Sequence, residues 1–284
     1  MPQENMPDRL SGNRQECSWA RRWMLIAASF FLLPGTMLAT AQQARPSDPN
    51  EELFTFFYKN ARPEKLVGFI EKYDATANGK WEAYPPFAGF FAIVFRTHPA
   101  QIERIVPARL TAQSATAIAA ALRLAGNQAA IEKLQPRFEQ AGSDEKLKAQ
   151  FVGLPNRLEE ISIRAPTHLD ILWGAAFASG DRRFVRMIID YFAQTANRSE
   201  AVAIDVAKVA IAIAGGPNQI YGELRSKYAN DASVQIIFAA TALWAIRSNS
   251  ERHAFVEQDV TAYIREHPGT PATKAISALR PKTR

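Results

Sequence analysis

The stretch HLDILWGAAFASGDRRFVRMIIDYF, residues 168–192, contains two amphipathic patterns separated by a Gly-Asp turn. Apolar residues recur at helical spacing in both halves: Leu169, Leu172, Trp173, Ala176 and Phe177, then Phe184, Val185, Ile188, Ile189 and Phe192. Gly180 ends the first helix because glycine adopts a positive φ without steric cost, and Asp181 can cap the second. The stretch predicts a helical hairpin whose structural residues are Trp173, Phe177, Gly180 and Asp181.

Three further segments show the same alternation of helix and turn. They are residues 85–110, 112–138 and 233–267, with turns at His98-Pro99, Gly126-Asn127 and Ser248–Ser250. Residues 200–216 are apolar on most sides, which predicts a central, buried helix. Since we find no convincing strand-like alternation, the expected fold class is all-α. The turns lack a fixed period, so we expect stacked antiparallel helix hairpins in an irregular α-solenoid or helical array.

Capping patterns mark the helix starts. Asp48-Pro49 and Thr270-Pro271 place a capping side chain before a proline, which lacks the N–H that a helix start leaves unpaired. Three polar residues are followed three positions later by an acid, which is the spacing of a capping box: Thr167 with Asp170, Asn197 with Glu200, and Ser248 with Glu251. We therefore expect Asp170 in the first turn of its helix, close to the positive end of the helix dipole.

The N-terminal region has the three parts of a secretory signal peptide. Arg21 and Arg22 precede an apolar run over residues 23–39, and Ala39 and Ala41 form an A-x-A pattern. The run contains a Pro-Gly break and is shorter than the ~20 residues that a bilayer span needs. We therefore expect cleavage after Ala41. The alternative is an uncleaved anchor in the inner membrane.

This interpretation divides the chain into three parts. Residues 1–41 are the expected signal peptide, residues 42–50 a flexible lead-in, and residues 51–280 the helical domain. Cleavage implies a periplasmic or secreted protein that is not stably inserted in the membrane.

Composition excludes several classes of protein. Cys17 is the one cysteine and lies before the cleavage site, so the exported chain has no thiol for a disulfide, a Cys-based metal site or catalysis. The net charge is +6, from 34 basic and 28 acidic residues, and no run of five like charges occurs. We therefore expect no nucleic-acid partner.

Histidine and acidic residues do not form a catalytic or metal-binding pattern. The four histidines show no H-x-x-x-H or H-E-x-x-H spacing, and we expect each at a helix boundary or on the surface: His98, His168, His253 and His267. No catalytic residue, metal or cofactor is predicted. Glu159 and Glu160 form an acidic pair that we expect to be solvated. The alternative is that one of them is the carboxylate of an enzyme acting on an envelope polymer.

Aromatic residues suggest one candidate binding groove. Within NGKWEAYPPFAGFF, residues 78–91, Trp81, Tyr84 and Phe87 flank a Pro-Pro break. Trp and Tyr suit binding sites because they combine apolar area with a polar tip. The other interpretation is that all three residues seal one helix pair against the next. The sequence leaves both interpretations open.

The segment LWGAAFASGDRRFVRMIID, residues 172–190, resembles the helix-turn-helix units of tetratricopeptide-like proteins, although the regularly spaced Tyr and terminal Pro of that repeat are absent. The chain also resembles exported helical proteins of bacteria, which implies no particular activity. By analogy of fold, the first resemblance implies a non-catalytic protein that binds a protein or peptide, or acts as a scaffold, in the cell envelope. A structural or stress-related envelope protein without a ligand is a further alternative.

Overall fold

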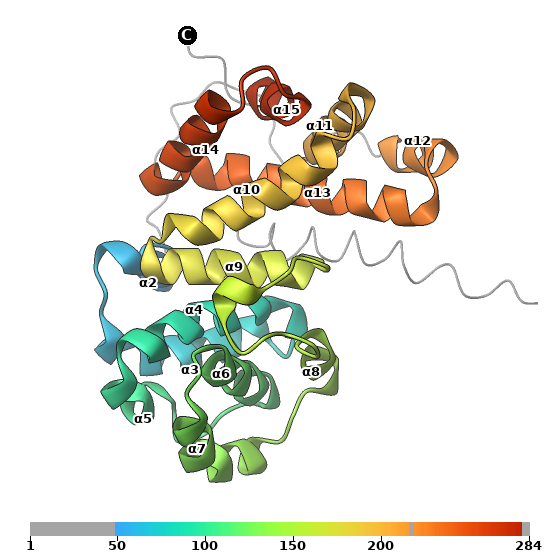
Figure 1. The fold of residues 1–284 in the computed structure, drawn as a ribbon. Coiled ribbons are helices and arrows are strands. Elements are labelled where there is room, and N and C mark those ends of the chain that lie inside the picture. Colours follow the sequence, from blue (N-terminus) through green and yellow to red (C-terminus); the bar gives the residue numbers. More distant parts are fainter. Residues whose placement is uncertain (1–48, 216–218, 280–284) are drawn as a thin grey trace, which may run out of the picture. The chain divides into compact units, whose positions relative to one another are not determined.

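The computed structural model describes residues 49–215 and 219–279, which form helices joined by turns and contain no strand (Figure 1). These residues belong to one compact unit. The all-α prediction is therefore confirmed. The expected signal peptide and all but the end of the lead-in lie outside the described residues. Among the described helices, none is long and apolar enough to cross a membrane.

The helices of the first half, with η marking the 3-10 helices, are α2 (Pro49–Thr55), η1 (Phe57–Lys59), η2 (Pro63–Lys65), α3 (Leu66–Ala77), η3 (Trp81–Ala83), α4 (Pro85–Thr97), η4 (Pro99–Gln101), α5 (Ile102–Ile105), α6 (Ala112–Leu124), α7 (Gln128–Ala141), α8 (Glu145–Gln150) and η5 (Leu158–Glu160). The helices that follow are α9 (Pro166–Ser179), α10 (Arg182–Ala196), α11 (Glu200–Ile213), α12 (Ile220–Lys227), α13 (Asn230–Ser250), α14 (Ala254–Glu266) and α15 (Pro271–Leu279).

The main helices pack one on another in an order that differs from the order along the chain. α7 packs on α6, α6 on α4, α4 on α9 and α9 on α10, which in turn packs on α13 (Figure 1). α11 lies between α13 and α15. The α4–α9 pair is the most extensive of these contacts, although the two helices are far apart in sequence. This gives an irregular helical array.

The hairpin predicted from residues 168–192 is present as α9 and α10. Gly180 ends α9 with a φ of 65°, and the carboxylate of Asp181 accepts a hydrogen bond of 2.9 Å from the amide of Arg183. Trp173 is buried and Phe177 half-buried, and their rings stack. The hairpin of α6 and α7 also begins its second helix as expected, because the side chain of Asn127 accepts from the amide of Ala130.

Two of the predicted helix starts have a different structure. α9 begins at Pro166, so Thr167 lies inside the helix, where its buried hydroxyl donates to Gln150. Asp170 is consequently beyond the first turn and is not a capping acid. α11 is capped by Ser199 and not by Asn197. The side chain of Asn197 instead accepts from the amide of Ala272, next to the start of α15.

The third predicted capping box is wrong, and the proline start at the C-terminus is correct. α13 continues through Ser248 to Ser250, and α14 begins only after His253. Thr270 does precede α15, and its hydroxyl accepts a hydrogen bond of 3.3 Å from the amide of Thr273.

Two segments pack differently from the prediction. α4 ends at Thr97 and is followed by the short η4 and α5, which together are too short to form the second helix of a hairpin. α11 is not buried on all sides, since Ile204 and Ile211 are 56% and 47% exposed. Its opposite face, which includes Val206 and Val209, is fully buried, and the helix packs against α13 and α15. α11 therefore has one buried and one exposed face, and apolar residues lie on both.

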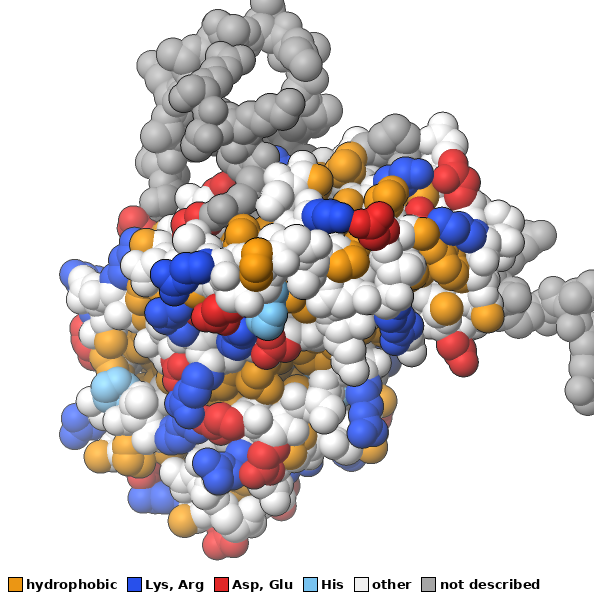
Figure 2. All heavy atoms as spheres, turned by 45° about the horizontal axis from the view of Figure 1, so that its top comes forward, with side chains coloured by type: hydrophobic (Ala, Val, Ile, Leu, Met, Phe, Trp, Pro, Cys, Tyr) orange, Lys and Arg blue, Asp and Glu red, His pale blue; other side chains and the backbone are white. Residues whose placement is uncertain are grey.

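The charged residues are spread over the surface. Figure 2 shows Lys and Arg side chains interspersed with Asp and Glu across the visible face. Several of them pair between helices, including Arg186 with Glu266 at 2.7 Å and Arg96 with Glu159 at 2.7 Å. On this face the positive charges do not gather into one continuous surface.

Candidate functional site

The aromatic residues of the predicted groove are mainly core residues. Tyr84 is 1% and Phe87 0% exposed, and their ring centroids lie 5.7 Å apart in an edge contact. Trp81 is half-buried in η3. α4 begins at Pro85, directly after η3, so its first turn places Phe87 against the aromatic rings of α3. Tyr84 and Phe87 therefore line no surface groove, and the core interpretation holds for both.

A hydroxyl–carboxylate cluster ties Tyr84 to its neighbours. The Tyr84 hydroxyl donates a hydrogen bond of 2.7 Å to Oδ1 of Asp74 in α3, and the hydroxyl of Ser114 in α6 donates to the same oxygen. Burial, and the hydrogen bond to the anionic Asp74, raise the pKa of Tyr84. The cluster connects α3, α4 and α6, and we assign it a structural role.

The acidic pair of the enzyme alternative does not have the environment of a catalytic acid. Oε1 of Glu159 accepts a 2.7 Å hydrogen bond from Arg96. Burial acts to raise the pKa of Glu159, but the hydrogen bond and charge of Arg96 outweigh it and hold the pKa below its usual value. The side chain of Glu160 is 55% exposed and lies 3.9 Å from Arg157. A general acid needs the opposite perturbation, a raised pKa.

His253 departs from the expectation of a boundary or surface histidine. It does precede α14, but its side chain is fully buried against the rings of Phe56, Phe177 and Phe255. Its Nδ1 lies 3.3 Å from the Tyr58 hydroxyl, and its Nε2 is buried without a hydrogen-bond partner. Burial lowers the pKa of His253 to about 4. The imidazole is therefore neutral at physiological pH.

Asp170 is the other titratable group in an unexpected place. It lies in α9 close enough to Tyr73 for its charge to raise the pKa of that hydroxyl. Burial raises the pKa of Asp170 to about 8, and its carboxyl receives no hydrogen bond from the described residues. Within the described ranges, no group of three or more His, Cys, Asp and Glu residues is placed to hold a metal ion.

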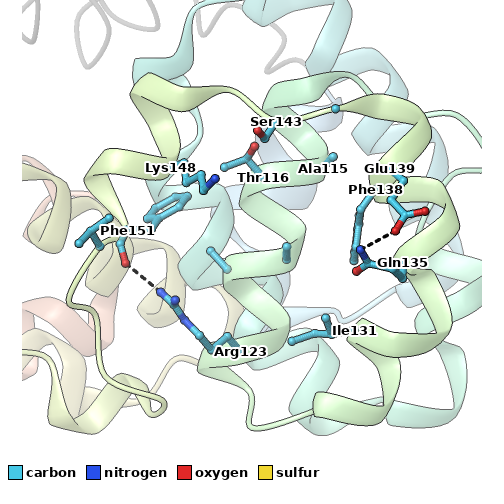
Figure 3. Close-up of a pocket in the computed structure, with 14 residues that line it drawn as sticks. Ala115, Thr116, Arg123, Ile131, Gln135, Phe138, Glu139, Ser143, Lys148 and Phe151 are labelled. Carbon is cyan, nitrogen blue, oxygen red and sulfur yellow. Dashed lines mark hydrogen bonds between the residues drawn. The ribbon is translucent and has the colours of Figure 1, made fainter.

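An open pocket lies between α6, α7 and α8, and we call it the α6–α8 pocket (Figure 3). Its volume is about 530 Å³, within the usual range for small-ligand sites. α6 forms the floor with small side chains, Ala115, Ala119 and Ala120. From Thr116 to Arg123 the floor extends for two helical turns, or about 10 Å.

The walls of the pocket are apolar and come from the other two helices. α7 contributes Ile131 and Phe138, and the turn that follows α8 contributes Phe151 and Val152. Figure 3 shows the α7 side chains on one side of α6, and Phe151 and Lys148 on the other. Val152 is 75% exposed, the highest value among the large apolar residues that the structure describes. The apolar surface of the pocket is therefore accessible to solvent.

Hydrogen bonds fix the α8 wall to the α6 floor at both ends. At one end the amide of Asp144 donates to the Thr116 hydroxyl over 3.0 Å. At the other end Nη2 of Arg123 donates to the carbonyl oxygen of Phe151 over 2.8 Å, as drawn in Figure 3. Because these bonds exist without a ligand, little ordering of the wall is needed for binding.

Polar groups surround the apolar surface, and most are bonded to each other. The amide of Gln135 donates to Glu139 over 2.9 Å, and the Lys148 ammonium lies 3.5 Å from Glu145. Arg123 differs, because its Nε is buried without an acceptor. The lining also includes Ser143, whose hydroxyl donates a hydrogen bond of 2.6 Å to the carboxylate of Glu145.

This pocket was not predicted from the sequence. Ala115, Ala119 and Arg123 recur every four residues along α6, which places them on one face. A row of alanines ending in an arginine is therefore the signal that the sequence contained. Comparison with protein-family models, with curated proteins and with solved structures finds no match to this chain.

Proposed function

We propose that the protein is a non-catalytic binding protein of the cell envelope, and that it holds an apolar peptide segment of a partner protein in the α6–α8 pocket. The observation that carries this proposal is the exposed apolar surface over an alanine floor, beside an α8 wall that hydrogen bonds fix to that floor. The location in the envelope rests on the signal peptide expected at residues 1–41.

The form of the pocket favours a peptide. Small side chains on the floor let the backbone of a ligand approach closely, and apolar walls can contact alternate side chains of an extended chain. About 10 Å of floor accommodates roughly three residues at 3.3 Å each. The pocket is open on one side, so the outer edge of a bound backbone keeps its contact with water.

The test is to fill the floor. Ala119 is a half-buried floor residue, and Ala119→Phe places a large ring in the pocket. Ala129 is exposed on α7 and does not line the pocket, so Ala129→Phe is the matched control. Both proteins, and the wild type, are titrated by fluorescence anisotropy with a synthetic library of labelled short peptides built from Ala, Val, Leu, Phe and Asp.

We expect a subset of the library to bind the wild type and the Ala129→Phe protein equally, and the Ala119→Phe protein at least about tenfold more weakly. Circular dichroism and thermal unfolding establish that both variants are folded. If no peptide binds the wild type, or if Ala119→Phe binds as well as the control, the proposal is wrong. A structural envelope protein without a ligand predicts that outcome.

The enzyme alternative has less support. It requires a carboxylate with a raised pKa in a concave site, and the pKa of Glu159 is lowered by its ion pair with Arg96. Hydrolysis of an envelope polymer that disappears in Glu159→Gln would favour the enzyme over the binding protein.

A further inference from the structure

Arg123 is the polar group of the α6–α8 pocket with the most unused hydrogen-bonding capacity. A guanidinium has five N–H donors in a fixed plane. One of them, from Nη2, reaches the carbonyl oxygen of Phe151, while Nε is buried without an acceptor. Because solvent does not reach Nε, a ligand in the pocket can meet Arg123 only through the N–H donors of its two Nη atoms.

The charge of Arg123 is also unbalanced. Every described ion pair of 4 Å or less involves other residues, so no carboxylate among the described residues neutralises this guanidinium. The one acid among the lining residues, Glu139, is on the opposite wall and accepts a hydrogen bond from Gln135 (Figure 3). Lys148 adds a second cation on the α8 wall, and its ammonium is only weakly paired with Glu145 at 3.5 Å.

The position of Arg123 relates the charge to the apolar surface. It is the last lining residue of α6, one helical turn beyond Ala119 and Ala120. A ligand lying along the floor therefore meets alanines first and the guanidinium at one end. Arginine binds carboxylates through two parallel N–H···O bonds, which fixes the direction as well as the charge of a ligand.

We propose that the bound peptide carries a carboxylate immediately after its apolar residues and that Arg123 binds this group. This inference rests on the proposed function, because it names the class of peptide for the same pocket. The carboxylate is that of the peptide C-terminus or of an Asp or Glu side chain, and both have the chemistry that a guanidinium recognises. Lys148 contributes additional long-range attraction from the solvent-exposed side.

The experiment compares matched peptides from the same labelled library. Each binding sequence is synthesised with a free C-terminal carboxylate, with a C-terminal amide, and with Asp replaced by Asn. The proteins are the wild type, Arg123→Gln and Arg109→Gln. Arg109 is an exposed arginine outside the pocket, and so Arg109→Gln is the control for loss of one positive charge. Thermal unfolding of each variant verifies that it is folded.

We expect removal of one of the two carboxylates to weaken binding to the wild type by about tenfold or more. Arg123→Gln should abolish this difference, while Arg109→Gln should preserve it. Dependence on the C-terminal carboxylate or on the Asp side chain identifies which source supplies the group. Arg123→Lys, which keeps the charge but not the paired geometry, should recover only part of the preference.

Three results would overturn the inference. Equal binding of all the matched peptides to the wild type would mean that no carboxylate is recognised, and the apolar pocket would stand if Ala119→Phe still prevented binding. Equal weakening of every peptide by Arg123→Gln would mean that Arg123 acts only through the α8 wall. Tight binding of decanoate, with no peptide bound, would exchange the peptide for a fatty acid and would also contradict the proposed function.

Discussion

Gly89 of α4 and Ile171 of α9 are in direct backbone contact: a Cβ added to Gly89 would lie 1.8 Å from the carbonyl oxygen of Ile171. The contact is reciprocal, since a Cβ on Gly174 would lie 1.8 Å from the carbonyl oxygen of Pro86. Two glycines, one on each helix, therefore allow α4 and α9 to approach more closely than side chains permit. This close approach joins the first half of the chain to the second.

Gly89→Ala should destabilise the protein by about 3 kcal/mol or more, because neither backbone can yield without moving a whole helix. Gly68→Ala is the control. Gly68 lies exposed in α3 with nothing within 4 Å of the position of an added Cβ. Alanine there should raise the free energy of unfolding by at most about 1 kcal/mol. Chemical denaturation of both variants measures the difference. A Gly89→Ala protein as stable as the wild type would show that the two helices are not in close contact.

Gly180→Ala should be more costly than Gly126→Ala. Both glycines have a positive φ, of 65° and 70°, so alanine is strained by about 1–2 kcal/mol at either site. At Gly180 a Cβ would also lie 2.9 Å from Cδ2 of Tyr58, whereas at Gly126 it would meet open space. We expect an excess loss of about 1 kcal/mol in the free energy of unfolding at Gly180. Equal losses at the two sites would contradict the contact with Tyr58.

His253 should make the protein less stable in acid. Its pKa is about 4 in the fold and about 6.5 in an unfolded chain, so between these values the unfolded chain binds more protons. The contribution of neutral His253 to the free energy of unfolding is fully present above about pH 6.5. It is lost as the pH falls to about 4, and the loss is at most about 3 kcal/mol. Burial is the main cause, followed by the charges of Arg252 and Lys59.

The measurement is the free energy of unfolding between pH 4 and pH 7. His253→Gln removes the titrating group and should flatten this part of the profile, whatever its effect on absolute stability. His98→Gln, at a histidine outside this ring cluster, is the matched substitution control. An unaltered slope in His253→Gln would mean that the imidazole is solvated.

Asp170 should produce the opposite dependence. Its pKa is raised to about 8, so the folded protein holds a proton that the unfolded chain releases near pH 4. Stability from this residue therefore falls as the pH rises from about 4 to about 8. Asp170→Asn should remove that slope and stabilise the protein at pH 8 by about 2 kcal/mol, allowing for partial solvent screening.

The control for Asp170 is Glu71→Gln, which neutralises an exposed carboxylate of α3. Comparison with this variant separates the effect of Asp170 from the general effect of removing one carboxylate. If Asp170→Asn also has the wild-type dependence, then the carboxyl of Asp170 is hydrated and ionised in the fold.

Local signals along the sequence predicted the helices well. Gly180 and Asp181 act at the turn as their conformational preferences require, and Asn127 and Thr270 cap the helices that follow them. These interactions join residues within one helical turn, so the chain itself contains the information. The all-α class follows from the same periodicity.

Long-range packing determined what could not be predicted. The spacing of Thr167 and Asp170 fits a capping box, but Pro166 begins the helix and Thr167 bonds to Gln150 instead. His253 is buried because Phe56 and Phe177, from two distant segments, pack against it together with the neighbouring Phe255, and no pattern near position 253 encodes the two distant rings. In α11 the apolar pattern alone does not separate the exposed Ile204 from the buried Val206, although the charged Glu200 and Lys208, one turn on either side of Ile204, mark the exposed face.

The candidate site was missed for a related reason. Trp81, Tyr84 and Phe87 suggested a groove because they are aromatic. A large ring, however, can pack in a hydrophobic core as well as on a binding surface. The α6–α8 pocket is made instead by the smallness of Ala115, Ala119 and Ala120, and by the helices that stand on either side of them. The absence of a large side chain is a weak signal until its neighbours are known.

The close contact of α4 and α9 also has a consequence for how this protein can diversify. The chain leaves that pair at residue 97 and returns to it at residue 166, and the intervening residues include all three helices of the pocket. The segment that forms the pocket therefore begins and ends at the α4–α9 pair. We call the close contact of these two helices at their glycines the junction. Under the proposed function, substitutions on the pocket side of α7 and α8 would exchange one ligand for another while the junction stays intact, so that ligand choice and fold stability would evolve under separate selection.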